Sequence, residues 1–331
     1  MIDKFRLVAA LLVIAIHTAP FASVNKSLDF VLTYGLGRIA VPFFLMTSGY
    51  FVLGPYLKSG FRENKKYLQY LKKIGLLYGG CILLYAPLMW YAKKLPGNLF
   101  EGVKMLVFDG TFYHLWYFPA LLLGSVLTVG LLQCSSKRWR IGIAFSLYLF
   151  GLLGDSYYRI STDIPPLSAV YDVLFLFSSY TRNGIFYAPL FLMMGALLWK
   201  KKICPSPVGC LVALALLMVE SFLTYYFGLQ RHNSMYLMLP VVMYFFYPLL
   251  LRGRQQAPRW LRRGTSFLYV IHPIAIILVR GMAGLMGMER LLVDQSLVHY
   301  IAVCAVSFCL MGYELYFLQL VKRFTRRKSD V

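Results

Sequence analysis

Acidic side chains are scarce in this chain of 331 residues, which has 13 aspartates and glutamates against 34 lysines and arginines. Charged residues make up only 14% of the sequence, whereas 59% of the residues are hydrophobic and the mean hydropathy is +0.64. A soluble domain rarely has this composition, which is typical of a polytopic membrane protein. The net charge of +21 would suggest a nucleic-acid partner in a soluble protein. Here the basic residues form short clusters between apolar runs, so membrane orientation explains the charge and no nucleic-acid partner is expected.

Motifs of several common enzyme classes are missing as well. The chain has no Gly-x-Ser-x-Gly elbow, no phosphate-binding loop and no His-Glu-x-x-His zinc motif. Its six cysteines are not spaced as metal ligands and lie in apolar runs or beside basic clusters, so we expect neither a disulfide framework nor a metal site. The first apolar run lacks a small-residue cleavage site, which argues against a cleavable signal peptide. No internal repeat is evident, so an inverted-repeat transporter is not favoured.

Ten apolar runs are suited to cross a membrane as helices, so the sequence predicts an all-α polytopic membrane protein with a single membrane domain, 1–331. Basic clusters occupy every second connection between these runs, and the positive-inside rule therefore puts both termini in the cytoplasm. The predicted spans are 7–24, 28–53, 74–91, 115–133, 141–154, 185–199, 208–228, 235–251, 265–285 and 297–320, followed by a basic cytoplasmic tail, 321–331.

The first apolar run carries Arg6 and, eleven residues later, His17. At about 100° and about 1.5 Å per residue, a helix puts both side chains on one face, roughly 16 Å apart. With Arg6 at the inner interface, His17 lies near the middle of a hydrocarbon core about 30 Å thick, where an ionisable group indicates a functional site. The alternatives are a positive-inside flank for Arg6 and, for His17, a neutral histidine hydrogen-bonded between helices. Pro20 follows one turn later, and we expect it to kink this helix.

Other polar or amphipathic side chains lie deep in the predicted helices or at their outer ends. We take nine of them as candidate substrate-binding residues: Arg38, His114, Trp116, Arg182, Glu220, Arg231, His232, His272 and Arg280. We expect Arg38, His272 and Arg280 to be buried, and deep charges usually pair. Asp155 completes this polar set at the outer face.

Two kinds of chemistry suit these residues. A histidine in such a cavity can act as a general base that activates a hydroxyl for acyl transfer, oriented by a carboxylate, while arginines stabilise developing negative charge. The same polar lining suits a zwitterion in transit. The residues alone leave both alternatives open.

A group of motifs resembles the acyltransferase-3 family of integral membrane acyltransferases. They are Arg6-x10-His17 in the first helix, the segment from Arg38 to Tyr50, His114-Leu-Trp-Tyr-Phe-Pro119, and Ile271-His272-Pro273. The ten spans with cytoplasmic termini are similar to that family too, and the resemblance covers essentially the whole chain. It implies a multi-pass protein of a bacterial plasma membrane that moves an acyl group, commonly acetyl from cytoplasmic acetyl-CoA, to an extracytoplasmic hydroxyl or amine, including cell-wall acceptors.

By this resemblance His17 is the catalytic histidine, Arg6 lies near the donor entrance, and acetyl-CoA is a cosubstrate rather than a permanently bound cofactor. Many members carry an Arg-x-x-Arg motif in the first large cytoplasmic loop, and this chain does not. Its basic segment, 58–73, offers four lysines as donor phosphate-binding residues: Lys65, Lys66, Lys72 and Lys73. Lysines meet phosphates as point charges rather than as bidentate forks, so this departure weakens the acetyl-CoA assignment.

A narrower resemblance is to the membrane domain of VanT-type membrane-bound serine racemases from glycopeptide-resistant bacteria. It rests on the segments around His17, Thr111–Ala120, Tyr180–Phe186 and Arg231–Tyr236. In those proteins a cytoplasmic racemase domain follows a membrane domain that is associated with L-serine uptake. The resemblance implies an alternative function, L-serine transport for a partner racemase domain. Because the chain ends at Val331, where such a domain would begin, we expect no racemase activity from it: it is either an excised domain or a stand-alone relative.

Overall fold

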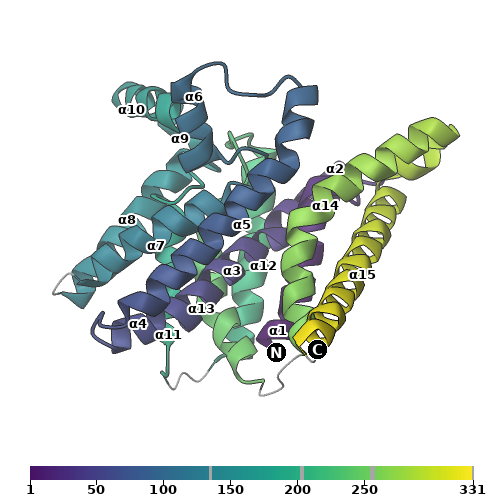
Figure 1. Ribbon diagram of the computed structural model, residues 1–331. Helices are drawn as coiled ribbons and strands as arrows, with labels where there is room; N and C mark the ends of the chain where they lie inside the picture. Colours follow the sequence, from purple (N-terminus) through teal and green to yellow (C-terminus); the bar gives the residue numbers. More distant parts are fainter. Residues whose placement is uncertain (134–135, 202–204, 254–257, 330–331) are drawn as a thin grey trace. The chain divides into compact units, whose positions relative to one another are not determined.

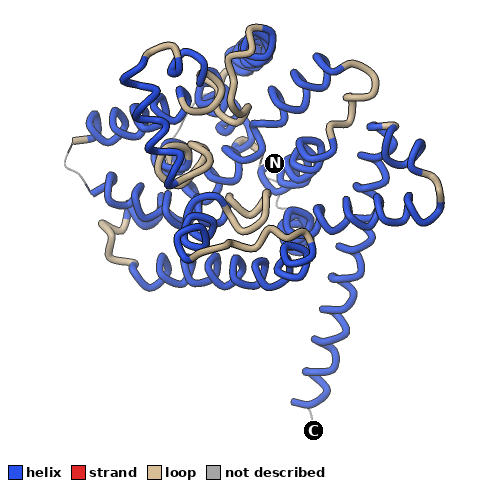
Figure 2. Tube along the Cα trace, turned by 90° about the horizontal axis from the view of Figure 1, so that it is seen from above, coloured by secondary structure: helices blue, strands red, loops and turns tan. Residues whose placement is uncertain are grey.

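The computed structural model describes residues 1–133, 136–201, 205–253 and 258–329, and every regular element in these ranges is a helix (Figure 2). The all-α fold is therefore as predicted. The chain divides into two compact units. Unit 1 combines the two ends of the chain, Met1–Ala40 and Leu249–Val331, and unit 2 is Val41–Pro248. A single membrane domain over 1–331 stays a prediction.

Long apolar helices make the chain a multi-pass membrane protein. Within the described ranges, five helices are long and apolar enough to cross a membrane: Lys26–Lys58, Asn64–Tyr91, Pro207–Tyr226, Trp260–Met286 and Ser296–Leu320. Four shorter apolar helices are Tyr117–Gln133, Pro165–Phe177, Ala188–Leu198 and Met238–Leu251. Each of the ten predicted membrane spans overlaps a helix of the structure.

Unit 1 is built on three helices, α1 (Ile2–Thr18), α14 (Arg259–Met286) and α15 (Ser296–Ser329). Helices α14 and α15 run side by side as a hairpin closed by η5 (Arg290–Asp294), and α1 packs on both (Figure 1). Ile14 is buried against Ala275 and Val303, which shows that apolar faces of all three helices meet. The start of α1 and the end of α15 lie on the same side of this unit (Figure 1), as expected for two termini in one compartment.

Helix α1 ends before Pro20 rather than continuing through it. Ala19 adopts a left-handed conformation with φ 48°, and its N–H bonds the carbonyl of Ala15. A left-handed residue closes the helix, and a proline just beyond the end cannot extend it. The predicted kink at Pro20 is therefore wrong, and the helix lies earlier in the chain than the expected 7–24.

The predicted span 28–53 is a succession of helical turns rather than one regular helix. It contains α2 (Lys26–Asp29), the π-helical η1 (Phe30–Gly35), the 3₁₀ turn η2 (Leu36–Ile39), α3 (Ala40–Ser48), the π-helical η3 (Gly49–Leu53) and α4 (Gly54–Lys58). Pro42 is the third residue of α3, directly after the 3₁₀ turn η2.

Unit 2 surrounds a short, almost fully buried helix, α11 (Ala188–Leu198). It packs against η3, α4, α7 (Tyr117–Gln133) and α8 (Lys137–Leu153). The other long helices of this unit are α5 (Asn64–Tyr91), α12 (Pro207–Tyr226) and α13 (Met238–Leu251). Two glycines allow α11 to touch the α3–η3 segment: a Cβ on Gly49 would overlap the carbonyl of Leu192, and one on Gly195 would overlap the carbonyl of Met46. Close backbone approach at small residues is the usual basis of helix packing in membranes.

The outer connections of unit 2 fold into short helices. They are α6 (Leu99–Lys104), the π-helical η4 (Met105–Asp109), α9 (Tyr158–Thr162) and α10 (Pro165–Phe177). Asp109 Oδ1 accepts a hydrogen bond from Ser179 N at 2.8 Å, and Lys104 Nζ donates to the Phe175 carbonyl at 3.1 Å. These bonds tie the two outer connections together and fix the segment around residue 180.

Two basic segments expected to be loops are helical. Helix α5 begins at Asn64 instead of residue 74, so the four predicted donor-binding lysines lie in its first three turns. Helix α15 continues through the expected tail as far as Ser329, and residues 330 and 331 lie outside the described range. Cys81, Cys210, Cys304 and Cys309 are free thiols, while Cys134 and Cys204 fall outside the described ranges.

Candidate functional site

Two histidines from opposite ends of the chain meet in unit 1. The rings of His17 on α1 and His272 on α14 stack with centroids 5.3 Å apart and an interplanar angle of 22°. His17 is half-buried, and His272 is fully buried beside Pro273. The structure thus brings the predicted catalytic histidine together with one predicted substrate-binding residue.

The orientation of His272 is fixed by the backbone of its own helix. Its Nδ1 lies 2.8 Å from the carbonyl oxygen of Tyr269. A carbonyl only accepts hydrogen bonds, so Nδ1 carries a proton in this contact. The stack therefore sets an oriented imidazole against His17.

The start of α1 carries a small ionic cluster. Asp3 lies 3.5 Å from Arg6 and 3.4 Å from Arg262 of α14, and a second pair joins Arg263 to Glu314 of α15 at 3.1 Å. Arg6 and His17 belong to one unbroken helix, as the predicted spacing requires. The charges thus gather at the end of unit 1 that the positive-inside rule assigns to the cytoplasm.

Arg38 lies in η2, close to the His17 turn of α1. The residue is 9% exposed, and its guanidinium sits 5.0 Å from the ring centre of Tyr34. The Tyr34 hydroxyl donates to the Ile16 carbonyl at 3.4 Å, one residue before His17. Arg38 is buried, as expected.

Arg280 does not behave as the sequence suggested. It is exposed on α14, whereas burial was expected, so that prediction is wrong for this residue. It lies near His299, whose Nδ1 is 2.8 Å from the Leu292 carbonyl. Val279 and Ala283 are buried on the packed face of α14, whereas Arg280 lies with the exposed Ile277 on another face of the helix.

A second cluster of predicted residues forms at the outer end of unit 2. The Arg182 guanidinium lies 4.4 Å from the ring centre of Tyr180 and 5.2 Å from that of Trp116. The His232 ring is 4.5 Å from the Tyr180 ring. The structure therefore places the Arg182 guanidinium against both Trp116 and Tyr180, with His232 on the Tyr180 ring. Aromatic faces attract cations and a guanidinium attracts anions, so this cluster is a candidate binding site.

Asp155 organises the backbone beneath this cluster. It is fully buried, and its Oδ1 accepts hydrogen bonds from Ser234 N at 2.6 Å, Met235 N at 2.9 Å and Ser156 Oγ at 3.0 Å. Ser234 Oγ in turn accepts a bond from Arg182 Nη1 at 2.9 Å. One serine thus links a buried carboxylate to a guanidinium.

Glu220 holds the start of α13. Its carboxylate accepts bonds from Leu237 N at 2.5 Å, Met238 N at 2.8 Å and the Tyr157 hydroxyl at 2.7 Å. A carboxylate at a helix N-terminus satisfies unpaired N–H groups and interacts well with the helix dipole. Burial, reinforced by the Glu220 charge, raises the pKa of Tyr157 well above its usual value, so this hydroxyl stays a hydrogen-bond donor at physiological pH.

The remaining predicted residues lie in different surroundings. His114 is buried, edge-on to the Tyr85 ring at 4.9 Å. Arg231 covers the Phe175 ring at 3.5 Å and donates to the Ser179 carbonyl at 3.0 Å. The lysines at 65, 66, 72 and 73 are all exposed on α5, and Lys66 pairs with Glu63 at 2.8 Å.

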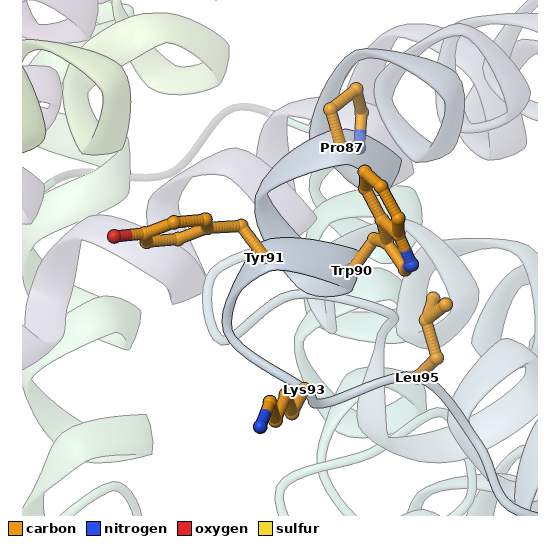
Figure 3. A pocket seen from close by; sticks show the side chains of 5 residues that line it. All are labelled: Pro87, Trp90, Tyr91, Lys93 and Leu95. Atoms are coloured by element: carbon orange, nitrogen blue, oxygen red, sulfur yellow. The ribbon is translucent and has the colours of Figure 1, made fainter.

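A cavity at the end of α5 contains none of the predicted site residues. It has a volume of about 640 Å³ and is lined by Pro87, Trp90, Tyr91, Lys93 and Leu95. In Figure 3 Tyr91 points away from Trp90 and Leu95, and Lys93 points in a third direction. These side chains do not converge on a common point, so the cavity resembles a surface hollow more than a reaction site.

Sequence reasoning missed three residues that shape these clusters. Tyr34, Tyr180 and Ser234 connect predicted residues to one another, but each is an ordinary tyrosine or serine near an apolar run. A signal was available only for Tyr180 and Ser234, which fall in segments that support the narrower resemblance.

These helices and clusters define a polytopic membrane protein with a stacked histidine pair. The chain belongs to the acyltransferase-3 family, whose acyltransferase domain matches residues 2–313. No solved structure matches the chain at a significant level.

Relatives with curated names match across nearly the whole chain. Two proteins of Enterococcus faecalis named amino-acid racemase are 36% and 37% identical over 318 and 315 residues, which cover 93% and 92% of this chain. A serine/alanine racemase of Enterococcus gallinarum is 33% identical over 339 residues, or 99% of this chain. The chain spans less than half the length of these relatives: 45%, 43% and 47%. The predicted similarity to membrane-bound serine racemases is confirmed.

Proposed function

We propose that this chain transfers an acyl group, with acetyl as the first candidate, from a cytoplasmic CoA thioester to an extracytoplasmic hydroxyl or amine. The observation that carries the proposal is the stack of His17 on His272 at 5.3 Å. Membership of the acyltransferase-3 family supports the same reaction class.

His17 is the general base in this proposal. It removes the proton from the acceptor as the acceptor oxygen or nitrogen bonds to the acyl carbon. The carbon–sulfur bond then breaks, and the thiolate of CoA takes the proton from the imidazolium. His272, oriented by the Tyr269 carbonyl, keeps the His17 ring in a reactive orientation.

The donor side is assigned to the basic residues of the cytoplasmic ends. Arg6 is held by Asp3 at the start of α1 and is one candidate contact for the donor phosphates. Lys65, Lys66, Lys72 and Lys73 are exposed at the start of α5 and are the others. If the lysines bind the donor phosphates, binding of the donor should weaken as the salt concentration rises.

L-serine transport is the second candidate function. Two observations favour it: the relative named serine/alanine racemase and the cluster of Trp116, Tyr180, Arg182 and His232. An arginine linked through Ser234 to the Asp155 carboxylate offers opposite charges for the two ends of an amino acid. A cytoplasmic racemase domain would then be the partner that receives the serine.

Purified protein in sealed liposomes with labelled acetyl-CoA tests the two functions. We expect CoA release by the wild type and a loss of about 10²–10⁴-fold in His17→Ala, the usual contribution of a general base. His299→Ala is the matched control, because His299 is a buried histidine of the same unit outside the proposed site. Labelled L-serine is offered to the same liposomes.

Two results separate the candidates. Turnover that disappears in His17→Ala and persists in His299→Ala supports acyl transfer. Serine entry, with no release of CoA from acetyl-CoA whichever acceptor is offered, would sink the acyltransferase proposal and leave a transport domain.

A further inference from the structure

Arg38 is a buried arginine without a carboxylate neighbour in the described residues. It is 9% exposed, and its Nε has no hydrogen-bond partner there. Among the acids of unit 1, Asp3 and Glu314 pair with other arginines, and Asp29 accepts bonds from a backbone N–H and from Thr33.

Such a group is costly unless something negative binds to it. A guanidinium does not lose its proton in proteins, so Arg38 cannot escape the cost by becoming neutral. Its contact with the Tyr34 ring at 5.0 Å recovers only part of the lost hydration. A buried charge of this kind in a membrane protein marks a binding function.

The position of Arg38 relates it to the histidine pair. Tyr34, which carries the guanidinium on its ring, is bonded through its hydroxyl to the Ile16 carbonyl. The turn that holds Arg38 packs closely on α1, because a Cβ on Gly37 would lie only 3.2 Å from Ile16 Cγ1. Arg38 and His17 therefore lie in the same region of unit 1.

We propose that Arg38 binds an oxygen anion beside His17. The shared chemistry is a negative charge spread over oxygen, which a guanidinium fork recognises. One source is the oxyanion that forms on the acyl carbonyl when the acceptor attacks, so this reading rests on the proposed function. The other source is the carboxylate of an amino acid.

The test is the melting temperature of the purified protein titrated with acetate, which supplies the planar carboxylate alone. We expect the wild type to be stabilised as acetate increases, since a ligand that binds only the folded state raises its stability. Arg38→Met melts no lower than the wild type without acetate, because an uncompensated charge has been removed, and it no longer responds to acetate. Arg290→Met, which changes an exposed arginine of the same unit, keeps the wild-type response.

An unchanged acetate response in Arg38→Met would overturn the proposal, as would a wild type that does not respond. Should Arg38→Met not fold, Arg38→Lys decides: it keeps the charge but loses the fork, and a response equal to the wild type's would again overturn the proposal.

Two further titrations identify the source of the anion. L-serine is compared with ethanolamine, which lacks the carboxylate, and a serine response that depends on Arg38 assigns the site to an amino acid. An acetate response without a serine response assigns it to the acyl-transfer oxyanion. If acetyl-CoA is never turned over while the acetate response still depends on Arg38, the proposed function fails and the anion site stands.

Discussion

Single buried side chains carry the charge chemistry of both units. In unit 1 the stacked His17 and His272 share a packed interior with Arg38. In unit 2 the Asp155 carboxylate holds the backbone of Ser234 and Met235 and so positions the residues that follow His232. Each arrangement depends on a particular atom pair, so each can be tested by a single substitution.

Asp155→Ala should destabilise the protein. Two buried backbone N–H groups lose their acceptor, and each unpaired group costs about 1–3 kcal/mol. We expect a loss of about 2–5 kcal/mol in the free energy of unfolding, measured by denaturant titration in detergent. Asp155→Asn keeps an acceptor oxygen and should lose less. Asp163→Ala, at an exposed position, is the control, and equal stability of Asp155→Ala and Asp163→Ala would refute this role.

Among the helices, α11 is the element around which unit 2 is packed. It is too short to span a membrane on its own, yet nearly all its residues are buried. Gly195 on α11 and Gly49 on η3 each face the other segment's backbone, which leaves no room for a side chain at either position. The contact between these two segments thus depends on small residues at both positions.

Gly49→Ala should lower the melting temperature, because the added Cβ would overlap the Leu192 carbonyl and force the two segments apart. Overpacking of this kind costs about 1–3 kcal/mol. Gly130→Ala in α7 is the control, since a Cβ there meets nothing within 4 Å. It should be neutral or stabilising by up to about 1 kcal/mol. Equal melting temperatures for the two variants would show that the segments are not in close contact.

Hydrophobic runs were sufficient to predict where helices occur, because each of the ten predicted ranges overlaps one. They were not sufficient to predict helix ends. The left-handed Ala19 closes α1 before Pro20, and Asn64 begins α5 within a basic segment, since charged residues continue a helix beyond the apolar run. Irregular turns such as η1 and η3 left no trace in the pattern of apolar residues.

At the level of the whole chain, the two ends form one unit and the middle forms another. The spacing of Arg6 and His17 pointed to a site on the first helix, but no local pattern indicates that His272 would stack on His17. Contacts between residues so far apart depend on tertiary packing, which a single sequence does not display. The resemblance to a family identified Ile271-His272-Pro273 as a motif, but it did not indicate that His272 contacts His17.

The alternation of basic clusters predicts which connections face the cytoplasm. In a background without native cysteines, Lys66→Cys at the start of α5 should react with an impermeant maleimide only after the membrane is opened. Asp163→Cys, in the connection that holds α9 and α10, should react in intact cells. The reverse pattern would invert the topology and put the lysines of α5 out of reach of a cytoplasmic donor.

The central claim is that His17 and His272 act as one catalytic unit. The most direct test is the rate of CoA release, with acceptor present, for His17→Ala, His272→Ala and the double variant. Groups that act as a unit have non-additive effects, so the double variant should be no slower than His17→Ala alone, while His272→Ala loses about 10- to 100-fold. A wild-type rate in His17→Ala, or losses that multiply in the double variant, would contradict the account.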